Sequence, residues 1–232
     1  MNTSKGSPTV ALLPEGVEVP PGIHGLAAFR AWAHSDQFPR SGRIDWISGR
    51  IEVDMSPEDL NTHASPKTTI AAALTDVVHR PGKGMVFIDR TRISSPSADL
   101  SAEPDVVVVL LETLKSGRAR LVPKAMGAPG RFVEIEGAVD LVVECVSDSS
   151  VEKDTKRLRE VYHRAGVPEY WTVDVRAESI ELSILLHEPS GYAPAPADSD
   201  GFFRSPLLGE RVRLARDKEA EGLVFFRLDR RP

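Results

Sequence analysis

Two carboxylates stand beside apolar segments whose residue types predict buried β-strands. Asp105 leads into the apolar run 106–111, and Glu144 lies inside the run 140–146. Burying a carboxylate is costly unless it is paired, hydrogen-bonded or bound to a metal ion. If the two strands pair, the two carboxylates approach closely enough to share one divalent cation. The alternative is structural, with each carboxylate capping its strand or pairing with an arginine.

The alternation of side chains along a strand predicts which groups face this cation. Glu103 and Asp105 are two residues apart and can point to the same side, whereas Cys145 points away from Glu144. Cys145 would therefore offer only its backbone carbonyl, and its thiol is expected in the core. Two carboxylates, one carbonyl and several waters suit Mg²⁺ or Mn²⁺. Such an ion polarises a phosphodiester and lowers the pKa of a bound water.

Composition restricts the classes of function. The chain has 232 residues, 41% of them apolar, a net charge of −5 and a single cysteine. The acidic balance counts against avid non-specific binding to nucleic acid, and one cysteine excludes an internal disulfide. No apolar run is long enough to span a bilayer, and the N-terminus has no signal-peptide pattern. We expect a cytoplasmic protein without a membrane segment.

The elements that hold the carboxylates can be read along the chain. Residues 1–22 are rich in proline and glycine and predict a flexible arm, and 23–232 are expected to form a single domain with C-terminal strands. Apolar spacing, turn residues and breakers predict helices at 26–33, from 65 or slightly earlier to 79, and at 153–165. They also predict hairpins at 43–55 and 169–185, strands at 85–88 and 223–226, and a surface loop at 189–201. This order predicts an α/β fold with a mixed β-sheet flanked by helices and extra β-hairpins.

Several motifs together resemble one known family. They are Glu103-Pro104-Asp105, the segment 140–144, the segment 166–174 and the opening hairpin 44–57. This order and spacing is similar to the Uma-type family of restriction endonucleases, in the PD-(D/E)XK nuclease superfamily. The resemblance implies a restriction-endonuclease-like core and metal-dependent cleavage of DNA. Asp105 and Glu144 would correspond to its metal-binding carboxylates.

The sequence departs from the superfamily pattern two residues after the glutamate. A lysine is expected there, and this chain has Val146, which cannot orient a water or neutralise a phosphate. Similar nucleases carry a lysine displaced onto the following helix, where this chain has Lys153 and Lys156 one turn apart. We favour Lys153 because it is nearer to the strand. The alternative for both lysines is a solvated helix face.

Three further residues are candidates through the same resemblance. His63 precedes the helix 65–79, where the family often has a histidine that could bind substrate or act near the metal. Asp45 takes the hairpin position where similar proteins place a glutamate, and Glu52 follows on the partner strand together with Asp54. For the histidine the alternative is an ordinary helix end, and for the acids an exposed strand face.

Two alternatives to an endonuclease remain at this level. Val146 favours a catalytically silent nuclease-fold module that binds a partner or nucleic acid. Phenylalanines in the C-terminal segment favour a dimerisation module, so a homodimer is possible. A basic segment with no acid between Glu112 and Glu134 could contact DNA phosphates or form a solvated loop.

Overall fold

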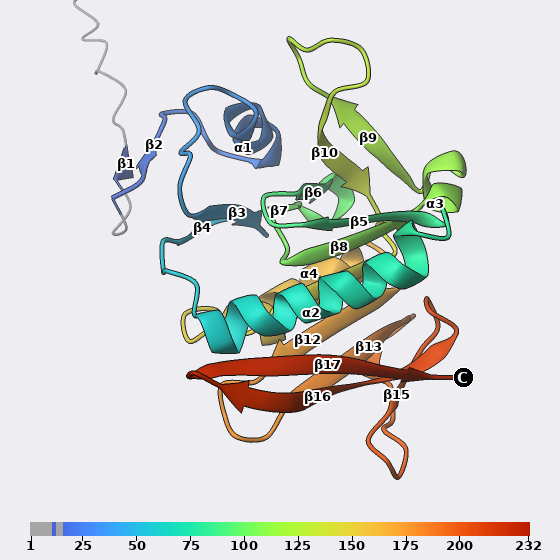
Figure 1. The fold of residues 1–232 in the computed structure, drawn as a ribbon. Helices are drawn as coiled ribbons and strands as arrows, with labels where there is room; N and C mark the ends of the chain where they lie inside the picture. The colour runs from blue at the N-terminus through green and yellow to red at the C-terminus, as the bar shows by residue number, and fades with distance from the viewer. Residues whose placement is uncertain (1–10, 13–15) are drawn as a thin grey trace, which may run out of the picture.

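The computed structural model of the protein describes residues 11–12 and 16–232 (Figure 1). Its centre is a six-stranded sheet in the order β14-β13-β12-β11-β8-β5. Strands β11 and β12 run parallel and the other neighbours antiparallel, so the sheet is mixed as predicted. The strands are β5 (Gly84–Ile88), β8 (Val106–Leu110), β11 (Leu141–Cys145), β12 (Glu169–Asp174), β13 (Glu181–Glu188) and β14 (Gly191–Pro194).

A second six-stranded sheet has the order β4-β3-β7-β6-β10-β9. It begins with the predicted hairpin, whose strands turn through Ser48 and Gly49, both with positive φ. Its strands are β3 (Arg43–Ile47), β4 (Arg50–Asp54), β6 (Arg92–Ser95), β7 (Leu100–Ala102), β9 (Ala119–Pro123) and β10 (Phe132–Gly137).

Two helical segments border the central sheet. The first joins η1 (Leu60–Ala64), α2 (Ser65–Leu74) and η2 (Thr75–His79), and Asp59 caps its start by accepting from the Asn61 and Thr62 amides. The second joins η4 (Lys153–Arg157) to α4 (Leu158–Arg164). Shorter elements are β1 (Ala11–Leu12), β2 (Glu18–Val19), α1 (Leu26–Ala33), η3 (Pro96–Ala98) and α3 (Leu111–Lys115).

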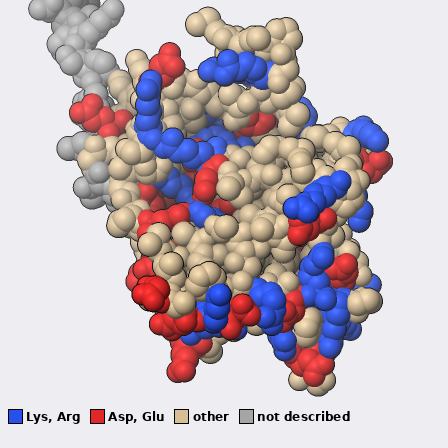
Figure 2. Space-filling model, viewed as in Figure 1, with Lys and Arg blue, Asp and Glu red and all other residues tan. Residues whose placement is uncertain are grey.

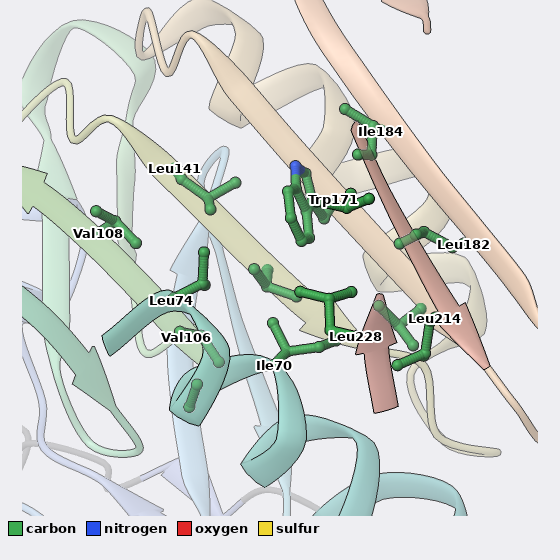
Figure 3. Packing of buried hydrophobic residues seen from close by; sticks show 14 of the residues in the cluster. Ile70, Leu74, Val106, Val108, Leu141, Trp171, Leu182, Ile184, Leu214 and Leu228 are labelled. Carbon is green, nitrogen blue, oxygen red and sulfur yellow. The ribbon is translucent and has the colours of Figure 1, made fainter. Parts of the chain in front are cut away.

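The central sheet is buried on both faces. On one face, α2 and a C-terminal sheet of β15 (Phe203–Ser205), β16 (Glu210–Ala220) and β17 (Leu223–Arg231) enclose a core around Trp171 (Figure 3). On the other face, α4, through Tyr162, and the second sheet pack on Val107 and Val142. Burial on both faces explains why β8 and β11 are continuous apolar runs. It also means that Asp105 and Glu144 enter a dry interior.

Several boundaries differ from the sequence prediction. The first helical segment begins at Leu60, in line with the predicted start at Ser65 or slightly earlier, but the expected loop 189–201 contains β14. The last strand extends to Arg231 and pairs with β16, which the sequence did not predict. Strands β6, β7, β9 and β10 were also missed, because their short polar-rich segments depend on sheet neighbours rather than on a local pattern.

The start of the chain lies partly within the described residues. Of the expected arm 1–22, residues 1–10 and 13–15 lie outside the described part, and Val17 and Val19 are buried beside Phe29 and Trp32. No helix in the described part is long and apolar enough to cross a membrane.

Candidate functional site

Asp105 and Glu144 meet at the ends of two paired strands. Antiparallel β8 and β11 pair Val106 with Val143, and one further step in this register sets Asp105 opposite Glu144. Both side chains are about 1% exposed. The Asp105 amide lies 3.3 Å from Glu144 Oε2, and the Cys145 amide donates to Asp105 Oδ2 at 2.7 Å. The two strands therefore bring the carboxylates together, as the sequence predicted.

Arg43, the first residue of β3, places its guanidinium between these carboxylates. One terminal nitrogen donates to Asp105 Oδ1 at 2.5 Å, and the other lies 3.7 Å from Glu144 Oε2. Burial would raise the pKa of Asp105, but Arg43 and then His63 outweigh it and hold this pKa well below its usual range. Burial and the charge of Asp105 raise the pKa of Glu144 well above its usual range. The pair thus consists of one strong anion and one carboxyl group that binds a proton readily.

Tyr162 and His63 complete the direct contacts of the pair. The Tyr162 hydroxyl, from α4, donates to Glu144 Oε1 at 2.8 Å. His63 Nε2 lies 3.2 Å from Asp105 Oδ2, and its Nδ1 lies 3.2 Å from Glu58 Oε1. Burial would lower the pKa of His63, but Asp105 outweighs it and raises this pKa. The histidine is therefore a buried partner of the carboxylate, and not an ordinary helix end.

The two candidate lysines take different positions. Lys153 is buried with its Nζ 3.6 Å from Asp45 Oδ2 and 3.9 Å from Asp154 Oδ1. Burial would lower the pKa of Lys153, but these carboxylates outweigh it and raise the pKa, so the ammonium stays charged. Lys156 is exposed and lines a separate cleft beside Arg159. Only Lys153 joins the buried polar cluster.

Asp45 and Glu103 are linked beside the carboxylate pair. Asp45 is buried and accepts a hydrogen bond from the Glu103 amide at 2.9 Å, which excludes the exposed strand face considered for it. Arg92 donates to Glu103 Oε1 at 2.6 Å. Glu52 lies farther out, where the Arg157 Nε is 2.7 Å from its Oε1. Val146 is buried in the core, so its position brings no charge to the site.

Two clefts lead to this region, with volumes of about 630 and 470 Å³. They share Arg43, Asp54 and Ser149, and the larger one also reaches His63. Neither Asp105 nor Glu144 lines either of these two clefts, and Arg43 and His63 stand between the open space and the carboxylates. Figure 2 shows both signs of charge crowded over β16 and β17, while the surface over α2 and β5 is largely uncharged.

Four residues of this centre were missed as functional candidates by sequence reasoning. They are Arg43, Lys67, Asp154 and Tyr162. Lys67, on α2, is buried and pairs with Glu58 and with Asp89, the latter at 2.7 Å. A charged residue inside a predicted helix or at a strand start resembles a solvated one, and only the long-range packing identifies it. Within the basic segment, Arg118 and Arg120 pair with Asp140 and Glu136, which neutralises part of its charge.

Comparison with known proteins identifies the class and then the family. The mixed sheet with flanking helices is a restriction-endonuclease-like α/β fold. It is similar to a crystal structure described as a "putative nuclease belonging to DUF820" from Anabaena variabilis, with a TM-score of 0.58 and 15% sequence identity, covering 80% of this chain and 90% of that chain. Residues 26–211 match the Uma2 family, described as "Putative restriction endonuclease", and the chain belongs to this family. No curated protein matches the chain.

Proposed function

We propose that this protein is a metal-dependent endonuclease that hydrolyses phosphodiester bonds in DNA. Family membership supports a nuclease function in general. The single observation that carries the proposal of metal-dependent DNA cleavage is the buried pair of Asp105 and Glu144. The two carboxylates lie opposite each other, and both contact the Arg43 guanidinium. Such a pair is costly to bury and has no structural purpose that apolar residues would not serve better.

The chemistry of the donor set fits Mg²⁺ or Mn²⁺. Among the described residues, no group of three or more His, Cys, Asp or Glu side chains could hold a metal ion. A cation here would depend on two carboxylates, the Cys145 carbonyl and water, which is how proteins commonly bind Mg²⁺. When bound, the ion would supply Lewis-acid activation of the phosphodiester. Asp105 and Glu144, which contact the Arg43 guanidinium in this structure, would hold it.

The other side chains have distinct proposed roles. Lys153 stays charged and would stabilise negative charge on the phosphate in place of the lysine missing at Val146. Arg43 opens onto both clefts and would contact the phosphate once it leaves the carboxylates. Tyr162 orients Glu144. His63 orients Asp105 through its Nε2.

The test is cleavage of supercoiled plasmid at low salt with Mn²⁺ or Mg²⁺. We expect wild type to nick the plasmid, and Asp105→Ala and Glu144→Ala to lose this activity. Lys153→Gln should reduce the rate by about 10²-fold or more, as removal of a charge-stabilising group does. A folded wild type that cleaves no DNA with either metal would overturn the proposal.

The second candidate is a silent nuclease-fold module. Val146 favours it, since the usual lysine position is apolar. It predicts DNA or partner binding without cleavage, and an unchanged binding constant in Asp105→Ala. A homodimer and a cytoplasmic location remain predictions, and sedimentation at several concentrations tests the former.

A further inference from the structure

A third cleft runs along the outer side of the second helical segment. Its volume is about 640 Å³. The helix contributes basic side chains to it, and the β13–β14 turn closes its other side. Its lining residues include Lys156, Arg159, Glu160, His163, Arg164 and Tyr192.

The positive charges of this cleft outnumber its acids, because Glu160 lines it together with Lys156, Arg159 and Arg164. Among the described residues, no carboxylate lies within ion-pair distance of these three basic side chains. Arg159 donates to the Tyr192 carbonyl at 2.9 Å, and Arg164 to the Ala98 carbonyl at 3.2 Å, so neutral oxygens hold the guanidinium groups in place. In a chain with a net charge of −5, this arrangement makes a local site for anions.

The catalytic centre contrasts with this cleft. Its cations Arg43, Lys67 and Lys153 are all engaged with carboxylates. The larger cleft beside it is lined by several acids, including Glu58, Asp89 and Asp148. Arg90 also lines this cleft and donates to the neutral Arg40 carbonyl. The centre therefore offers less unpaired positive charge than the third cleft, which could supply the rest.

The geometry of the helix connects the two places. Residues 153–157 form the π-helical turn η4, and α4 continues the segment to Arg164. The seven residues of α4 alone rise by about 11 Å at 1.5 Å per residue, which equals about three base pairs of duplex. Lys156, Arg159 and His163 line the same cleft, so they lie on one side of this segment. Lys153, at the start of the same helix, reaches the carboxylate cluster.

We propose that the cleft lined by Lys156, Arg159, His163 and Arg164 binds the phosphate backbone of DNA beside the cleavage position. This inference rests on the proposed nuclease function and extends it, because it assigns the flanking strand to a surface with no role so far. Lys156 then serves DNA binding and not catalysis.

The test measures DNA binding by the full chain in EDTA. Fluorescence anisotropy of a labelled duplex reports the binding across a salt series. The cleft variant combines Lys156→Gln, Arg159→Gln and Arg164→Gln. The control combines Lys115→Gln, Lys124→Gln and Arg131→Gln, which removes the same charge from the basic segment near β9 and β10.

The cleft variant should bind DNA about tenfold or more weakly and lower the slope of log K against log salt by about two to three, while the control changes affinity about twofold or less. Equal losses in both variants, or an unchanged cleft variant beside a binding wild type, would overturn the inference alone. A wild type that neither binds nor cleaves DNA would overturn the proposed function as well.

If the triple variant does not fold, Lys156→Glu tests the same DNA-binding role of the cleft. This side chain is exposed and donates no hydrogen bond to the described residues, so its replacement should leave the melting temperature unchanged. We expect a lower salt slope, by about one or more, and weaker binding. A binding curve equal to that of wild type would refute the assignment.

Discussion

Replacing Arg43 with glutamine should destabilise the protein in the absence of metal. The change removes the guanidinium from two carboxylates that are each about 1% exposed. Breaking a buried pair by removing one partner typically costs about 3–5 kcal/mol. Because Glu144 has a raised pKa and His63 still neutralises part of the charge on Asp105, we expect a cost near the lower end, about 3 kcal/mol.

Thermal unfolding in EDTA measures this cost. For a chain of this size, about 3 kcal/mol corresponds to a decrease of roughly 6–12 °C in the melting temperature. Arg157→Gln is the matched control, because its side chain is 36% exposed and pairs with the outer residue Glu52. This control should cost about 1 kcal/mol or less.

A double-mutant cycle identifies the partner of Arg43. In an Asp105→Asn background the cost of Arg43→Gln should fall by about half or more, because the anion left without a counter-charge is no longer present. Added Mn²⁺ should raise the melting temperature of Arg43→Gln more than that of wild type. A decrease below about 2 °C for Arg43→Gln in EDTA would refute the account of a guanidinium that neutralises this pair.

Tyr162, Asp154 and Gly84 each contribute to stability through their immediate surroundings. Tyr162→Phe removes the donor to Glu144 Oε1 and should cost about 1–3 kcal/mol in urea denaturation, and a neutral result would mean that water replaces the hydroxyl. Burial raises the pKa of Asp154 from 3.8 to about 6, so the folded state binds the Asp154 proton more tightly than the unfolded state does. The protonated carboxyl group therefore stabilises the fold fully below pH 3.8, and this stabilisation is lost as the pH rises through about 6. Relative to Asp154→Asn, wild type should therefore lose up to about 3 kcal/mol between about pH 4 and about pH 7, and parallel pH profiles would contradict the shift. Gly84→Ala places a Cβ 2.4 Å from the Val109 carbonyl oxygen across β5 and β8 and should destabilise the fold by about 1–3 kcal/mol, whereas a melting temperature equal to wild type would show that the strands separate freely.

Local patterns in the sequence predicted much of the fold. The hairpin around Ser48 and Gly49 was predicted from apolar alternation and turn residues. The strand pairing and the positive φ of the two turn residues confirm it. The Cys145 thiol was predicted to lie in the core, and Cys145 is buried. The short strands β6, β7, β9 and β10 could not be predicted in this way. Their pairing depends on partners from distant segments, as in the parallel pair of β6 and β10.

The candidate site shows the same division. A carboxylate beside an apolar run carries its own signal, because its burial demands compensation, and this is why Asp105 and Glu144 could be identified. The compensating group has no such signal. Arg43 lies 62 residues before its partner Asp105, at the start of a strand where a basic residue is ordinarily solvated.

The two acidic strands, the family and the missing lysine after Glu144 could all be recognised from the amino-acid order. Side-chain period and the cost of burial act locally, so they can be read from neighbouring residues. The folded chain was needed to see that Arg43 lies between the carboxylates, that Lys153 points inward and that Lys156 faces another cleft. The physical reason is that ion pairs depend on distance in space, which the packing of β3 and the second helical segment against the central sheet sets.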